Sequence, residues 1–158
     1  MPEDNTIQIF FSFYSDILDE ETTETLEASV FEKEFGYYKL ESAPFFAPKI
    51  AMGDIVWADH SSLDGVLTYR KTVQHSGNST IHVIIMDDAY TIETVREIFT
   101  DMGCPSAELN HKYFALTIPA AVDYIPVKRK LDELAKQGAL DYAESGLSAK
   151  HEYKNISF

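Results

Sequence analysis

The residue types best suited to chemistry lie between Thr68 and Met86, in the stretch TYRKTVQHSGNSTIHVIIM. His75 could serve as a general base while Arg70 or Lys71 steadies an anionic group. Strand parity opposes this arrangement, because Arg70 and Lys71 would point to opposite faces of one strand. Ser-Gly-Asn at 76–78 is also typical of turns, so the stretch predicts a structural turn, with ligand binding or catalysis as the alternative. The alternative ligand site comprises Tyr69, Arg70, His75 and His82.

Metal binding and the common enzyme motifs are not predicted. No two of the five histidines have the i, i+4 spacing of a helical zinc site. The sequence has no phosphate-binding glycine loop, nucleophile elbow or dinucleotide fingerprint. Asp54 follows Gly53 at the start of an expected strand and is interpreted as a turn-capping carboxylate, and Cys104 as a buried structural thiol. We therefore expect no metal, no cofactor and no catalytic residue.

Acidic residues are concentrated at one end of the sequence. The formal net charge is −13, and residues 1–32 contain nine acidic side chains and no Lys or Arg, whereas the rest contains 17 acidic and 13 basic ones. This distribution opposes direct binding to nucleic acid or to an anionic membrane and favours a basic protein partner. The other interpretation is a solvated surface that keeps the protein soluble. The expected partner contacts are Asp16, Asp19, Glu20, Glu21, Glu24 and Glu27, with Asp87 and Asp88 as a second patch.

The length of 158 residues suits a single domain, and ten Phe and nine Tyr provide for a sizeable core. The N-terminal sequence MPEDNTIQIFF lacks the basic and apolar regions of a secretory signal, and no apolar run is long enough to span a membrane. With a single cysteine, these features predict a protein of the reducing cytoplasm. The oligomeric state stays open.

The first half of the sequence is predicted to be mostly antiparallel β-structure. In the acidic, threonine-rich segment 15–28, Ser15 could cap a short helix, but the segment is interpreted as a loop that leads into the strand at 27–35. Gly36 is interpreted as a hairpin turn. Between 43 and 54 we expect an ordered loop in which Phe45 and Phe46 contact the core. Strands are expected at 7–14, 27–35, 54–60 and 66–75.

The second half alternates strands with helices. Thr91 and Asp123 are expected to begin the two helices, and Gly103 and Gly138 to end them. The strands are expected at 79–86, 112–119 and 139–146. This order predicts an α+β fold in which an antiparallel β-rich N-terminal half joins a ferredoxin-like βαβαβ C-terminal half. The expected single domain covers 1–148, with a β-rich half at 7–78, an α/β half at 79–147 and a polar tail at 149–158.

Several phrases of the sequence together resemble one bacterial family. They are YYKLESAPFFAPKIAMGDIV, VQHSGNSTIHVII, MGCPSAEL, LTIPAAVDY and GALDYAESGL. In this order and at these spacings they resemble the family known as domain of unknown function 4265, over Ile7 to Leu147. The family's typical SGHSTIRV has His and Arg where this chain has Asn78 and His82, so a catalytic His or anion-binding Arg at those places would be lost here. The resemblance implies a small soluble bacterial protein and supplies no substrate, cofactor or catalytic residue.

These features favour an acidic cytoplasmic protein-binding module. The concrete expectation is an immunity protein or antitoxin that neutralises a basic bacterial toxin, such as a nuclease. A toxin that binds RNA or DNA must display Lys and Arg, and an inhibitor can cover that surface with carboxylates. The alternative, from another class, is a small enzyme or small-ligand sensor with a site around the Tyr69–His82 hairpin.

Overall fold

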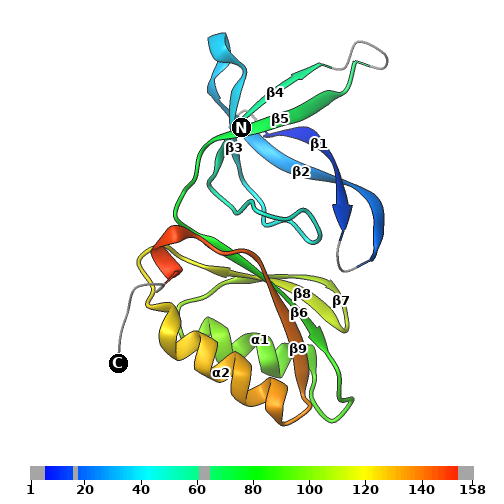
Figure 1. Ribbon diagram of the computed structural model, residues 1–158, viewed down its shortest axis with the longest axis vertical. Helices are drawn as coiled ribbons and strands as arrows, with labels where there is room; N and C mark the ends of the chain where they lie inside the picture. Colours follow the sequence, from blue (N-terminus) through cyan, green and yellow to red (C-terminus); the bar gives the residue numbers. More distant parts are fainter. Residues whose placement is uncertain (1–5, 16–17, 61–64, 153–158) are drawn as a thin grey trace, which may run out of the picture.

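The protein has two parts stacked along its long axis, a β-barrel and a sheet backed by helices (Figure 1). The computed structural model describes residues 6–15, 18–60 and 65–152. Five strands form the closed barrel, and four strands with two helices form the second part. The fold is therefore mixed α+β, as the sequence predicts. Across these three ranges, no helix is long and apolar enough to cross a membrane.

The barrel is built by the N-terminal half. Its elements are β1 (Thr6–Ser15), β2 (Glu20–Glu32), the 3-10 helix η1 (Lys33–Phe35), β3 (Tyr37–Leu40), β4 (Ile55–His60) and β5 (Leu67–Gln74). Consecutive strands pair antiparallel, and one parallel pairing, Phe10 with Thr68, closes the barrel between β1 and β5. Alternate side chains of these strands point inward. The barrel core includes Ile9, Phe11, Leu26, Ala28, Leu40, Val56 and Ala58.

Strand β2 occupies much of a segment for which the sequence analysis predicts a loop. Its ladder with β1 runs without interruption from Glu20 opposite Ser15 to Ser29 opposite Thr6. The prediction of a loop is therefore wrong from Glu20 to Leu26, whereas the strand predicted from Glu27 is confirmed as far as Glu32. The threonines of this segment are β-branched and suit a strand, and cross-strand pairing with the aromatic residues of β1 outweighs the low strand propensity of glutamate.

The C-terminal half forms the sheet and both helices. Its elements are β6 (Ser79–Ile85), α1 (Ile92–Thr100), β7 (Ser106–Asn110), β8 (Tyr113–Ile118), α2 (Tyr124–Lys136), β9 (Leu140–Gly146) and the 3-10 helix η2 (Ala149–His151). The strand order is β7-β8-β6-β9, with antiparallel neighbours throughout. The predicted helix starts are confirmed, because Thr91 accepts the Thr94 N–H and Asp123 accepts the Ile125 N–H. Strand β7 was not predicted, since SAELN has no β-branched residue and lies at the sheet edge.

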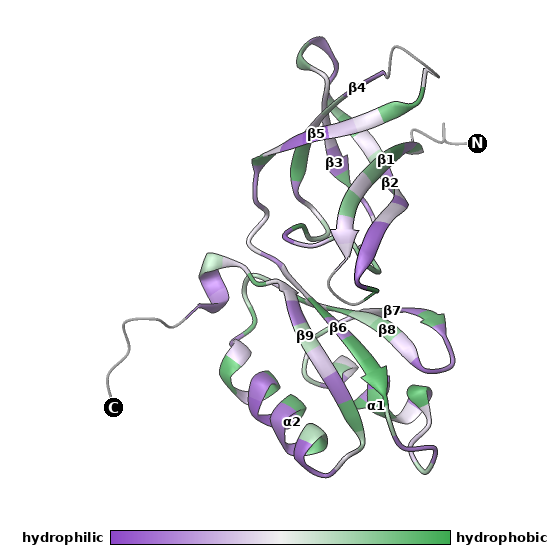
Figure 2. Ribbon diagram, turned by 45° about the vertical axis from the view of Figure 1, so that its right-hand side comes forward, coloured by the Kyte–Doolittle hydropathy of each residue, from purple (hydrophilic) through white to green (hydrophobic). Residues whose placement is uncertain are grey.

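The two faces of the sheet have different neighbours. Val83 of β6 and Leu116 of β8 point toward the helices and are fully buried, together with Phe99 of α1. The outer face of α2 is largely hydrophilic (Figure 2). Because side chains alternate along a strand, His82 and Ile84 point to the opposite face, which is the face nearer the barrel.

The loop between β3 and β4, residues 41–54, joins the two parts. Ala47 and Ile50 belong to the barrel core. The Ile50 carbonyl also accepts a hydrogen bond from Thr80 Oγ1 of β6 at 2.9 Å. Gly146 of β9 lies against the same residue, since a Cβ there would lie 2.7 Å from the Ile50 carbonyl oxygen. The loop is ordered, as predicted, and it packs on both parts at once.

Residues 149–152 belong to the folded unit, so assigning them to a polar tail is wrong. His151 is buried, and its Nε2 donates to the carbonyls of Pro119 and Val122 at 3.1 and 3.2 Å. Its Nδ1 accepts from Ser79 Oγ at 2.6 Å. These bonds fix His151 to the sheet and to the loop before α2. Residues 153–158 lie outside the described residues.

Candidate functional site

The predicted ligand set of Tyr69, Arg70, His75 and His82 is spread over separate surroundings. Tyr69 packs against the barrel core, with its ring stacked on Phe11 at a centroid distance of 4.5 Å. Arg70 forms an ion pair with Asp59 on the barrel exterior. The two histidines lie nearer the junction of barrel and sheet and bind different partners. The four side chains therefore do not line one pocket.

Asp54 and His75 meet where the chain leaves the barrel. The Asp54 carboxylate is buried and accepts the N–H groups of Ala51 at 3.0 Å and Ser76 at 2.8 Å. His75 Nδ1 lies 3.4 Å from Asp54 Oδ2, although the imidazole itself is mostly exposed. Asp54 is thus the turn-capping carboxylate that the sequence predicts.

The turn at 76–78 holds barrel and sheet together. Ser76 Oγ and Asn78 Nδ2 both donate to the Met52 carbonyl, at 2.9 and 2.8 Å. Asn78 Oδ1 accepts the Ala120 N–H at 2.9 Å. Gly77 has φ +94°, and a Cβ there would lie 3.0 Å from the Ala120 side chain. These contacts give the turn a structural role in joining the barrel to the sheet.

His82 is buried below the 41–54 loop. Its Nε2 lies 2.8 Å from the Pro44 carbonyl and its Nδ1 lies 2.6 Å from Ser145 Oγ. Since a carbonyl only accepts, Nε2 carries the hydrogen and Nδ1 accepts from the serine. Burial lowers the pKa of His82, and the hydrogen bond to Pro44 opposes this only in part. The neutral ring thus has both nitrogens occupied and positions the loop on the sheet.

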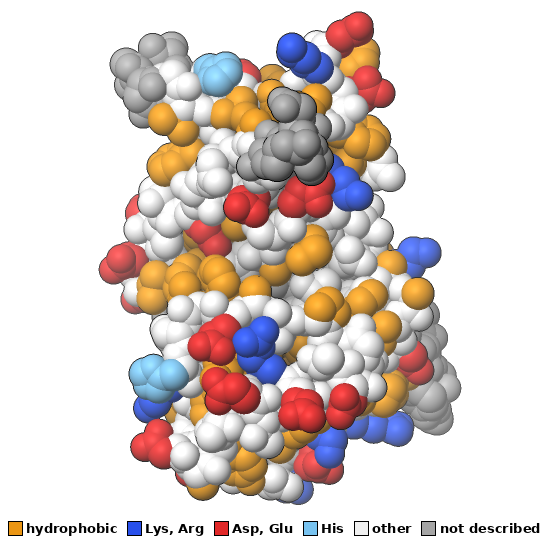
Figure 3. All heavy atoms as spheres, turned by 180° about the vertical axis from the view of Figure 1, so that it is seen from behind, with side chains coloured by type: hydrophobic (Ala, Val, Ile, Leu, Met, Phe, Trp, Pro, Cys, Tyr) orange, Lys and Arg blue, Asp and Glu red, His pale blue; other side chains and the backbone are white. Residues whose placement is uncertain are grey.

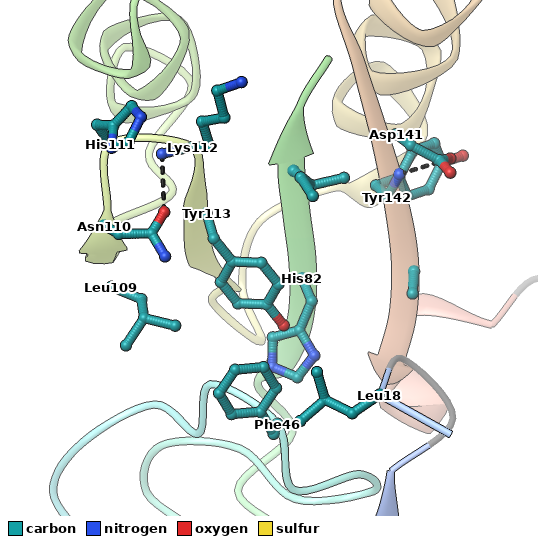
Figure 4. Close-up of a pocket in the computed structure, with 12 residues that line it drawn as sticks. Leu18, Phe46, His82, Leu109, Asn110, His111, Lys112, Tyr113, Asp141 and Tyr142 are labelled. Carbon is teal, nitrogen blue, oxygen red and sulfur yellow. Dashed lines mark hydrogen bonds between the residues drawn. The ribbon is translucent and has the colours of Figure 1, made fainter. Parts of the chain in front are cut away.

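An apolar groove, called here the sheet groove, runs along the open face of the sheet (Figure 4). Its volume is about 670 Å³. Phe46 stacks on Tyr113 at 5.3 Å, and the Tyr113 hydroxyl donates to the Phe45 carbonyl at 2.5 Å, so this wall is held in place. Burial and the negative charge of Glu24 raise the pKa of Tyr113, which keeps the phenol neutral. The exposed apolar side chains that line the groove are those of Leu18, Ile84 and Leu109.

The barrel end of the sheet groove is acidic. Leu18, which is 44% exposed, lines it directly. The next three residues, Asp19, Glu20 and Glu21, are all exposed at the tip of the β1–β2 hairpin. Asp19 has φ +55°, and its carboxylate accepts a hydrogen bond from Tyr14 of β1. Three of the predicted partner contacts therefore lie next to an apolar surface.

The far end of the sheet groove also carries acidic side chains. Lys112 lines this end, opposite Leu18 in Figure 4. Its ammonium lies 3.5 Å from the carboxylate of Asp88, which offsets its charge. Asp141 of β9 belongs to the lining as well. The sheet groove therefore connects the predicted acidic segment to a member of the predicted second patch.

The remaining predicted contacts have other positions. Glu24 accepts the N–H groups of residues 45–47 at 2.6, 3.0 and 2.9 Å, so its carboxylate fixes the 41–54 loop. Glu27 is exposed on β2, and Asp87 accepts the Ala89 N–H at 2.9 Å in a turn. Asp16 lies outside the described residues. Seen from behind, acidic and basic side chains are interspersed, while hydrophobic ones gather at mid-height (Figure 3).

Two further kinds of site receive no support from the geometry. In the described part of the chain, no group of three or more His, Cys, Asp or Glu is placed to hold a metal ion. Cys104 is buried in the helix-side core, and burial raises its pKa to about 11. A thiol with so high a pKa is a poor nucleophile at neutral pH.

Sequence reasoning missed the sheet groove. Its exposed apolar residues come from the β1–β2 hairpin, from β6 and from β7, the strand that was not predicted. In β6 the residues Val83, Ile84 and Ile85 form a continuous apolar run, so alternation does not mark Ile84 as exposed. The available signal in the sequence was the aliphatic pair Ile17-Leu18, which stands between Asp16 and Asp19.

The chain is similar to a solved structure described as "Novel crystal structure of a hypothetical protein from Neisseria gonorrhoeae". The TM-score is 0.79 at 20% sequence identity, and the match covers 93% of this chain and 99% of that chain, which shows a shared fold. No curated protein matches the sequence. The model of the family "Domain of unknown function (DUF4265)" matches residues 24–142, most of the chain. As its motifs predict, the chain belongs to the DUF4265 family.

Proposed function

We propose that this protein is an acidic, cytoplasmic protein-binding module that neutralises a basic partner. The observation that carries the proposal is the sheet groove, an apolar surface with Asp141 in its lining and with the exposed residues Asp19, Glu20 and Glu21 directly after Leu18. Its partner is a protein segment that presents apolar side chains between lysines or arginines. The concrete form is an immunity protein or antitoxin that covers the cationic surface of a bacterial toxin, such as a nuclease.

The groove and its acidic ends have complementary roles in such binding. Leu18, Ile84 and Leu109 are 44%, 41% and 42% exposed, so a partner would remove apolar area from water that folding has left accessible. The carboxylates of Asp19 and Glu21 would steer a cationic partner and fix its register. The net charge of −13 extends that attraction beyond the contact itself.

The groups most suited to chemistry support a binding role rather than catalysis. His82, His151 and Asp54 are buried and hydrogen-bonded to neighbouring loops. Each of them joins two segments that are distant in sequence. Such residues stabilise a scaffold that presents a rigid surface.

We also propose that residues 79–146 form a ferredoxin-like unit. The order of elements is strand, helix, strand, strand, helix, strand, and it includes β7 in addition to the predicted βαβαβ order. The first and third of these strands, β6 and β8, lie in the centre of the sheet. Both observations support this assignment.

The proposed function is tested by co-expression with the C-terminal domain of a toxin encoded beside this gene. Growth rescue by the natural chain is expected. A triple variant with Asp19→Asn, Glu20→Gln and Glu21→Gln is expected to weaken binding about 10- to 100-fold, at roughly 0.5–1 kcal/mol per rim charge. The same charge change on α1 provides the control, because that helix lies on the other face of the sheet. The control substitutions are Glu93→Gln, Glu97→Gln and Asp101→Asn.

Three results would count against the proposal. One is equal binding by the hairpin triple variant and the α1 control. Another is an affinity that does not change between about 50 and 500 mM salt, because electrostatic attraction between exposed groups is screened over that range. The third is a Leu18→Ala variant that binds as tightly as the natural chain, because this would show that the groove does not contribute to binding.

A further inference from the structure

A second cavity, called here the junction pocket, lies on another side of the 41–54 loop. It is bounded by residues 49–54 of that loop, by 75–78 of the turn and by 144–152. Its volume is about 670 Å³. The polar share of its lining is larger than that of the sheet groove. Its side chains include Lys49, Asp54, His75, Glu144, Lys150 and Glu152.

Two carboxylates of the junction pocket accept hydrogen bonds from neighbouring groups, whereas its two lysines form no ion pair with a described acidic side chain. Asp54 accepts two backbone N–H groups, and Glu144 accepts from Tyr124 at 2.6 Å and from Lys128 at 3.2 Å. Among residues 6–15, 18–60 and 65–152, neither Lys49 nor Lys150 forms an ion pair with an acidic side chain. Two ammonium groups that form no such ion pair therefore line one cavity, together with the carboxylates of Asp54, Glu144 and Glu152.

Lys49 is held at the pocket in an unusual backbone conformation. Its φ is +66°, the left-handed region that favours glycine. Its N–H donates to the Ser145 carbonyl of β9 at 2.7 Å, which fixes its position at the pocket. Strained backbone positions cluster at functional sites. Here the strained residue carries a charged side chain on the wall of a polar cavity.

Lys150, an exposed residue of η2, also lines the junction pocket. Its side chain packs close to Gly77, where an added Cβ would lie 3.5 Å from Lys150 Cγ. Its N–H donates to Ser148 Oγ at 2.9 Å, in the turn that also anchors buried His151. The aliphatic part of the Lys150 side chain is therefore positioned by η2, the segment that also contains His151. The imidazole of His75, oriented by Asp54, adds a third nitrogen-bearing group to the lining.

We propose that the junction pocket binds a small oxygen-rich anion, a carboxylate or a phosphate, between Lys49, Lys150 and His75. Ammonium groups donate charge-assisted hydrogen bonds to such oxygens, and an imidazole N–H adds a further donor. Glu152 lies in the same lining and opposes the anion, so its charge sets a limit on affinity. This site is separate from the sheet groove and does not depend on the proposed partner.

The test is an NMR titration of the full chain with inorganic phosphate and with citrate, each against sodium chloride at equal ionic strength. Saturable shifts are expected at the amides of 75–78 and 145–150. The double variant Lys49→Ala with Lys150→Ala is expected to weaken binding at least about tenfold, and Glu152→Gln to strengthen it about threefold. The control is Lys136→Ala, at the exposed end of α2, which leaves binding unchanged.

Each outcome decides the proposal. Saturable binding of phosphate alone or of citrate alone supports it and names the class of anion. The absence of saturable shifts up to about 50 mM of both anions overturns it. So does a double variant that stays folded and binds as tightly as the natural chain.

Discussion

Replacing Glu24 with Gln tests whether this carboxylate organises the 41–54 loop. Its Oε2 accepts the Phe45 N–H at 2.6 Å, and its Oε1 accepts the N–H groups of Phe46 and Ala47 at 3.0 and 2.9 Å. The amide of Gln keeps one acceptor oxygen and places an NH₂ group where the other oxygen was, so one backbone N–H would face a donor. The loss of a hydrogen bond to a charged acceptor, together with an unsatisfied N–H, costs about 2–3 kcal/mol. For a chain of this size that is a fall of roughly 5–10 °C in Tm.

The assay is urea denaturation followed by tyrosine and tryptophan fluorescence, with Glu27→Gln as the matched control. Glu27 lies on the same strand and is exposed, so its variant is expected to stay within about 0.5 kcal/mol of the natural chain. Equal stability of the two variants would refute the reasoning. In that case the loop would be held by its apolar contacts alone, and Glu24 would return to the set of partner contacts.

Three further expectations follow from single residues. Gly146→Ala should lower the free energy of unfolding by at least about 2 kcal/mol in chemical denaturation, because the new Cβ would lie 2.7 Å from the Ile50 carbonyl oxygen; unchanged stability would contradict the close packing. Burial raises the pKa of Cys104 from 9.0 to about 11. At pH 8 this thiol should therefore react with iodoacetamide at least about 100-fold more slowly in the folded chain than in the unfolded chain. Equal rates would show that the thiol is accessible. Because the pKa of His82 is lowered in the folded chain, the unfolded chain binds a proton at this residue more readily. The contribution of the neutral His82 to stability is therefore complete above about pH 6.5 and is lost as the pH falls below that value. Denaturation between pH 5 and 8 should show a smaller decline for His82→Gln, and identical slopes would exclude His82 as the cause.

The sequence predicted those elements whose signals are local. Thr91 and Asp123 mark the helix starts because capping depends on a side chain and the N–H groups two or three residues later. Asp54 as a turn cap followed from the same kind of local bond. Strand β2 was partly missed, since its pairing with β1 depends on a second segment rather than on its own composition.

The candidate sites could not be predicted in the same way. The prediction that Arg70 and Lys71 point to opposite faces assumed simple alternation along β5. That alternation is interrupted, because the pairing of β5 with β4 shifts register between Trp57 and Ala58. Glu24 is indistinguishable in the sequence from its acidic neighbours, yet only the fold brings it to three backbone N–H groups. Cavities formed between distant segments leave no periodic signal.

The position of Ile50 has a consequence for how the molecule comes apart. Its side chain packs in the core of the barrel, while its carbonyl accepts a hydrogen bond from Thr80 of the sheet. Separating the barrel from the sheet would expose Ile50 and leave the Thr80 hydroxyl without its acceptor. Neither half would therefore keep its full stability alone. Calorimetry should accordingly record a single cooperative transition, and excised fragments corresponding to either half should be poorly folded.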